Sequence, residues 1–210
     1  MMNRRLLART AVAGALTLSL VGGVVTAQTA ATRVPAEVQA GTYKLDAGHG
    51  KITWKVNHLG FSTYIGQFIN VSADLTLDPS NPANSTLTAT VPLADVAPND
   101  DGLKAHLQTP DFFNTAEFPT ATFVAKSIVV DREAPTEADV IGDLTLHGVT
   151  RSVTLEVEFN QAGPSMGNTY KVGFDGETTI RRSEFGMSYG LPAIGDEVEL
   201  HIEGEFVKQP

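Results

Sequence analysis

Residues 197–206 read Glu-Val-Glu-Leu-His-Ile-Glu-Gly-Glu-Phe, a stretch in which polar and small or apolar side chains alternate. Strict alternation is typical of a β-strand whose two faces meet different surroundings. One face of this stretch presents carboxylates and His201 to water, while the other presents Val198, Leu200 and Ile202 to a core. The stretch therefore predicts an antiparallel sheet that is wet on one side and buried on the other.

The same period of two recurs along the chain, in residues 52–56, 69–77, 86–93 and 153–160. Breaker clusters separate these runs at residues 78–82, 98–102, 147–148 and 162–164, and they are typical of tight turns. Residues 101–114 have a helical pattern interrupted by Pro110, so we expect two short helical pieces there. An eight-stranded closed sheet leaves no exposed edge and encloses space for one slender ligand. The pattern predicts an all-β antiparallel barrel with a short helical insert.

The first 27 residues have the features of a cleavable signal peptide. Arg4, Arg5 and Arg9 precede an apolar run over 12–25, and Val25-Thr26-Ala27 offers small residues for cleavage. The run is shorter than the roughly 20 residues that span a bilayer. The adjacent arginines leave both general and twin-arginine export open. We expect a signal peptide over 1–27, a flexible leader over 28–41 and one domain over 42–207, in a periplasmic or secreted protein.

Composition excludes several functions. A net charge of −9 disfavours nucleic-acid binding, which needs clustered cations. The absence of cysteine excludes disulfides, thiolate nucleophiles and cysteine-ligated metals. The five histidines form no close pair, so no metal site is expected. The Gly-x-Ser-x-Gly match at 163–167 has no helical pattern after it, which favours a surface turn over a hydrolase nucleophile. No catalytic residue is predicted.

Aromatic residues gather around the helical insert, and small residues lie on the expected inner faces. The small ones are Gly60, Ala73, Ala89 and Ala121. Two interpretations remain at this point. The large side chains either fill the barrel solidly or line a cavity that the small residues leave open.

Eight segments in order give the chain a likeness to a known family. They are YKLD (43–46), WKVNH (54–58), GQF (66–68), HLQTPDFF (106–113), FPTATF (118–123), GDLTLHGVT (142–150), RSEFG (182–186) and GDEV (195–198). In these the chain resembles the YceI-like family of exported polyisoprenoid-binding proteins, across residues 41–206. The resemblance implies an extended, lipocalin-like, eight-stranded antiparallel barrel that holds a long isoprenoid chain in its pore. It also implies a homodimer, no catalysis and no required cofactor.

The resemblance implies a set of ligand-binding residues. For the pore wall we expect Trp54, Val56, Phe68, Phe112, Phe113, Phe123, Leu144, Leu146, Phe174 and Phe185. For the head group we expect His58, His106, Arg182 and Ser183. The ligand would be a polyprenyl lipid or a prenylquinone. Two alternatives to a simple carrier are an accessory that delivers quinone to a membrane cytochrome, and a small enzyme that uses His58 or His106 as acid and base.

Overall fold

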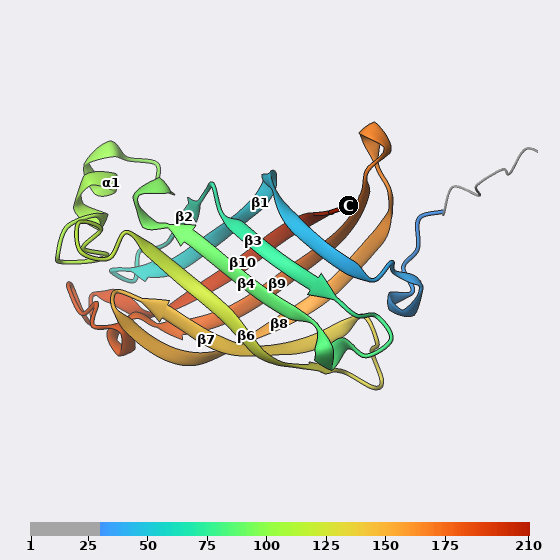
Figure 1. Cartoon of the computed structure of the whole chain (residues 1–210). Helices are drawn as coiled ribbons and strands as arrows, with labels where there is room; N and C mark the ends of the chain where they lie inside the picture. The colour runs from blue at the N-terminus through green and yellow to red at the C-terminus, as the bar shows by residue number, and fades with distance from the viewer. Residues whose placement is uncertain (1–29) are drawn as a thin grey trace, which may run out of the picture.

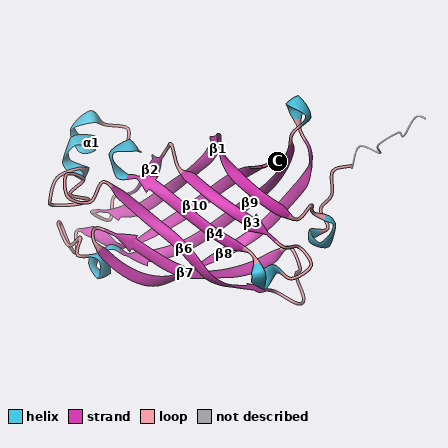
Figure 2. Cartoon of the chain, in the orientation of Figure 1, coloured by secondary structure: helices cyan, strands magenta, loops and turns pink. Residues whose placement is uncertain are grey.

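Residues 30–210, the part of the chain that the computed structural model describes, form one closed antiparallel sheet (Figures 1 and 2). Its strands are β1 (Gly41–His58), β2 (Ser62–Phe68), β3 (Ser72–Leu77), β4 (Thr86–Pro92), β5 (Val96–Ala97), β6 (Thr120–Val130), β7 (Glu137–Leu146), β8 (Val149–Pro164), β9 (Tyr170–Arg181) and β10 (Ile194–Lys208). The helix α1 (Asp101–Leu107) lies at one end of the barrel. Short 3₁₀ turns are η1 (Pro35–Glu37), η2 (Pro82–Asn84), η3 (Leu93–Asp95), η4 (Met166–Asn168) and η5 (Arg182–Phe185).

Pairing between the first and last long strands closes the barrel. β10 runs beside β1 from the Tyr43–Lys208 pair to the His58–Ile194 pair. The N-terminal part of β1 pairs with β3 and its C-terminal part pairs with β2. β2 and β3 therefore share one position in the wall, and the short β5 only extends β2. The result is the predicted eight-stranded antiparallel barrel.

The alternation in the sequence sets which side chains face inward. Leu200 and Ile202 of β10 lie opposite Trp54 and Ile52 of β1. Cross-strand partners share a face of the sheet, so all four point into the barrel. Glu199 and Glu203 lie opposite Lys55 and Lys51 on the outer face. The predicted wet and buried faces are confirmed for these strands.

The insert between β5 and β6 contains one helix and not two. Asp100 caps α1 because its Oδ1 accepts a hydrogen bond from the backbone N–H of Leu103 at 2.7 Å. The helix ends at Leu107, before Pro110. Turns follow, and Asn114 adopts a left-handed φ of 46°, which interrupts any second helical piece. Within residues 30–210 no helix is long and apolar enough to cross a membrane.

Two other predictions concern the ends of the sheet. The Gly163–Gly167 match lies at the β8–β9 hairpin, as the predicted surface turn, and Gly167 has a φ of 73°. Residues 30–40 differ from the expected flexible leader because they pack on the barrel. Thr32 and Ala162 exchange backbone hydrogen bonds of 2.7 and 2.9 Å, and Val38 is buried. The predicted signal peptide lies outside the described residues.

A bulge in β1 is held by an ion-paired cluster. Leu45 pairs with Phe206, but the next partners are Gly50 and Gly204, so β1 carries extra residues between them. Asp46 in this bulge lies 2.8 Å from the Lys171 ammonium, which also contacts Glu205 at 2.7 Å. His49 Nδ1 lies 2.9 Å from the same Asp46 carboxylate. The hydrogen bond from Lys171, followed by that from His49, lowers the pKa of Asp46 to about 2.

The lowered pKa of Asp46 predicts a pH dependence of stability. Its contribution should be fully present above the ordinary pKa of 3.8 and should be lost as the pH falls through about 2. In Asp46→Asn this part of the acid dependence should disappear. Urea denaturation at several pH values in this range measures the free energy of unfolding. The control is Asp74→Asn, because Asp74 is 74% exposed in its pair with Lys44. Equal acid dependence in Asp46→Asn and the unsubstituted protein would contradict the assignment.

Candidate functional site: the barrel cavity and its two ends

A cavity of about 260 Å³ lies inside the barrel. Apolar side chains from β1, β3, β4 and β6 to β10 line it, including Leu87 and Val91 of β4, Leu155 of β8 and Ile202 of β10. These four face inward but are only half-buried. A close-packed interior would cover such side chains almost completely. The barrel is therefore hollow along part of its length and is not packed solid.

Small residues leave this space open. Ala73 and Ala89 are cross-strand partners, and Ala121 lies opposite Val91. All three alanines line the cavity, as the inward pattern predicts. Gly176 also lines it, between the inward residues Val157 and Ile202. Gly60 differs, because it lies in the β1–β2 hairpin with open space around it.

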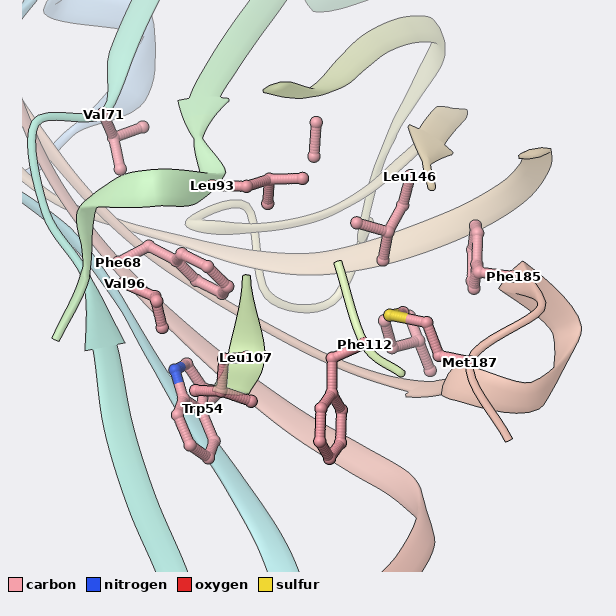
Figure 3. Close-up of a cluster of buried hydrophobic side chains, with 12 residues drawn as sticks. Trp54, Phe68, Val71, Leu93, Val96, Leu107, Phe112, Leu146, Phe185 and Met187 are labelled. Carbon is pink, nitrogen blue, oxygen red and sulfur yellow. The ribbon is translucent and has the colours of Figure 1, made fainter. Parts of the chain in front are cut away.

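The end of the barrel near α1 is filled by a plug of buried side chains (Figure 3). Trp54 stacks on Tyr64 with ring centroids 5.8 Å apart, and Phe68 meets Phe113 edge-on at 5.5 Å. A Cβ on Gly66 would lie 2.2 Å from the Trp54 ring, so glycine makes room for the indole. Within the described residues the buried indole N–H of Trp54 has no hydrogen-bond acceptor.

The expected pore-wall residues divide between the cavity and the plug. Phe123, Leu144 and Phe174 line the cavity. The others lie in the plug or pack against it, namely Trp54, Val56, Phe68, Phe112, Phe113, Leu146 and Phe185. The sequence pattern contained the aliphatic lining, because those residues occupy the apolar positions of the alternating strands. Most of the residues expected in the pore wall are aromatic, and most of these aromatic residues lie in the plug.

The two histidines expected at the head group lie near the α1 end. His58 ends β1, and its ring lies 6.2 Å from that of Tyr64. His106 Nε2 lies 2.9 Å from the Asp111 carboxylate, and its ring meets Phe112 and Tyr189 edge-on at 5.0 and 5.1 Å. Neither imidazole lines the cavity.

Arg182 and Ser183 organise the loop between β9 and β10. The guanidinium of Arg182 is buried and donates to the carbonyls of Met187, Ile194 and Gly195 at 2.8–3.0 Å. Burial lowers the pKa of Arg182, and the nearby Asp196 acts in the opposite direction. Ser183 donates from its backbone N–H and its hydroxyl to the Asp196 carboxylate, at 2.9 and 2.8 Å. Each guanidinium nitrogen of Arg182, and both the backbone N–H and the hydroxyl of Ser183, therefore donate to a partner within the protein.

The other end of the barrel opens to solvent. Three segments form this mouth, residues 30–38, 78–85 and 131–137, and they contribute Pro35, Pro79, Pro82 and Pro135 to the cavity lining. All four prolines are at least partly exposed. No residue of α1 or of the loop between β9 and β10 reaches the lining. The breaker cluster at 78–82 marked one of these segments in the sequence, but nothing in the pattern brought the three together.

The role of Arg182 leads to a stability prediction. Arg182→Ala leaves three carbonyls without their donor, one of them in a buried hydrogen bond and two in part-buried ones, and we expect the free energy of unfolding to fall by about 3 kcal/mol. Arg182→Lys should not restore it, because one ammonium cannot reproduce the planar fork. The neighbouring Arg181→Ala is the control. Arg181 is 60% exposed in its pair with Glu197, so its loss should cost less than about 1 kcal/mol. Similar small losses in urea denaturation for Arg182→Ala and Arg181→Ala would contradict this role.

Comparisons with known proteins agree with this architecture. The chain is 35% identical over 172 residues to the protein YceI of Escherichia coli O6:H1, covering 81% of this chain and 88% of that one. The crystal structure of BcnA from Burkholderia cenocepacia matches with a TM-score of 0.68 at 25% identity, covering 79% and 99%. A polyisoprenoid binding domain from Saccharophagus degradans shares the fold, with a TM-score of 0.62 at 15% identity and coverage of 81% and 100%.

The family assignment follows from the extent of the match. The model of the YceI-like domain matches residues 43–206, which run from the inward Tyr43 of β1 to Phe206 near the end of β10. The matched stretch includes nearly all of both strands that close the barrel, and the whole helical insert. This chain belongs to the YceI-like domain family.

Proposed function

We propose that this protein is an exported, non-catalytic binding protein that holds the tail of an isoprenoid lipid in the barrel cavity. The observation that carries the proposal is a hollow, apolar barrel, plugged at the α1 end and open at the mouth. The Saccharophagus degradans domain, which has the same fold, is described as polyisoprenoid binding. Export rests on the basic and apolar pattern of residues 1–27.

The energetics favour a hydrocarbon tail. Each buried CH₂ gains roughly 0.8 kcal/mol, so a few isoprene units offset the cost of ordering the chain. The cavity of about 260 Å³ lies just below the roughly 300–1,000 Å³ of ordinary small-molecule sites. We therefore expect it to hold the end of a prenyl tail and not a whole long chain.

The geometry supports binding over catalysis. An acid or base must reach the atom that it protonates or deprotonates. His58 and His106, the histidines of the enzyme alternative, both lie outside the cavity lining. A prenylquinone would fit the same cavity, so quinone delivery to a membrane cytochrome stays a prediction, as does the homodimer.

Identification of the bound lipid tests the proposal. The mature protein should be purified without detergent, weighed by native mass spectrometry, and then extracted with organic solvent. A stoichiometric adduct that proves to be a prenyl chain would support the function, and a quinone head would favour delivery. An empty protein that also takes up no added prenyl lipid would refute it.

A substitution inside the cavity gives a sharper prediction. A Cβ on Gly176 would meet Val157 and Ile202 at an ordinary 3.7 Å, so Gly176→Leu should fold and fill the cavity. We expect lipid occupancy to fall at least tenfold, a loss of about 1.4 kcal/mol in binding. Gly173→Leu on the same strand is the matched control. Gly173 pairs with Glu205 on the outer face and has similar open space. Native mass spectrometry measures occupancy, and unchanged binding in Gly176→Leu would place the ligand elsewhere.

A further inference from the structure

The mouth of the cavity is poor in groups that could bind an anion. The four prolines that line it have no backbone N–H to donate. The buried Ser85 hydroxyl in the lining accepts the backbone N–H of Asp78 at 2.9 Å and has only one O–H to donate. Lys51, the one basic residue of the lining, lies on the outer face and forms an ion pair with Glu203 at 3.1 Å, and the arginines of the mouth segments, Arg33 and Arg132, are exposed and outside the lining.

The mouth is also negatively charged. Its three segments carry the acidic residues Glu37, Asp78, Asp131, Glu133 and Glu137. Their basic residues are Arg33 and Arg132. Hydrogen bonds from Ser80 and Asn84 lower the pKa of Asp78, which keeps that carboxylate ionised. Acidic groups therefore outnumber basic ones around the opening.

The outer face of the barrel beside the mouth is also acidic. A surface hollow beside the mouth is bordered by carboxylates of β7, β8 and β9, and it shares Glu137 and Asp175 with the cavity lining. Glu158 lies directly opposite both Glu137 and Asp175. Glu156 lies opposite both Asp139 and Glu177. Like charges placed opposite each other across strands repel, and together they project a negative potential over the neighbouring opening.

We propose that the cavity selects prenyl lipids whose head group carries no negative charge, such as a prenol or prenylquinone, and excludes prenyl phosphates. This inference rests on the proposed function. The tail would enter first through the mouth, because the plug fills the other end, and the head of a short prenyl lipid would stop among the prolines. A phosphate monoester carries about −1.5 to −2 charges at neutral pH and needs cations or several N–H donors. The carboxylates of the mouth would instead repel a phosphate head group.

A competition experiment tests this selection. The mature protein is incubated with phosphatidylcholine vesicles that contain equal amounts of geranylgeraniol and geranylgeranyl phosphate, which share one tail. The protein is separated from the vesicles, and its bound lipids are extracted and quantified. We expect the alcohol to exceed the phosphate at least tenfold at low salt. High salt should narrow this ratio, because screening weakens the repulsion.

Charge reversal at the two ends of the barrel supplies matched variants. Glu133→Lys at the mouth should raise phosphate binding about threefold and leave alcohol binding unchanged, as expected for a surface charge acting at short range. Glu184→Lys makes the same charge change on the exposed surface of η5, near the α1 end, and should alter neither.

The outcomes separate this inference from the function on which it rests. Phosphate bound as well as or better than the alcohol by the unsubstituted protein would overturn the selection and leave lipid binding intact. Equal effects of Glu133→Lys and Glu184→Lys on phosphate binding would overturn the placement of the head at the mouth. If neither lipid is recovered with the protein, the proposed function fails, and the selection fails with it.

Discussion

The pairing of β1 with β10 is the constraint on which the other features of the molecule depend. It joins the first and last strands of the sheet and removes the edges that would otherwise be exposed. A chain without cysteine has no disulfide to staple such a sheet, so closure and burial must supply the stability. Closure also fixes the circumference, and eight strands enclose a space that inward side chains can either fill or leave open.

The space inside the barrel is filled in one half and partly open in the other. Near α1, large aromatic side chains and the residues of the insert fill it, with Gly66 making room for Trp54. The other half also contains packed aromatic rings, those of Phe159, Phe174 and Phe206, but alanines and medium-sized aliphatic residues beside them leave the cavity open. Most strands run through both halves, so the difference arises from side-chain volume and from the insert, whose Leu107, Phe112 and Phe113 add to the plug. This asymmetry gives the barrel one closed end and one open end.

Polar interactions hold the two irregular parts of the wall. At the β1 bulge, Lys171 joins Asp46 and Glu205 across three strands. At the β9–β10 loop, Arg182 donates hydrogen bonds to the carbonyl of Met187 in the loop and to those of Ile194 and Gly195 at the start of β10. Both cations stand where the regular ladder of backbone hydrogen bonds is interrupted, and each provides donors that the strand geometry lacks there. Arg182 is therefore explained by the fold without any ligand.

The sequence by itself determined the architecture and the inward faces. Alternation in β10 and in residues 153–160 was enough to predict an antiparallel barrel, because a period of two assigns each side chain to one side of a sheet. Alternation also placed Ala73, Ala89 and Ala121 inside. Only the tertiary structure decided which inward residues face empty space, because that depends on the volumes that meet across the barrel. Phe112 and Leu146 have the same apolar character as Phe123 and Leu144, yet they lie in the plug while the latter line the cavity. The tertiary structure also decided which residues form the mouth. Its prolines come from three segments far apart in the chain, and only the closed sheet brings these segments together.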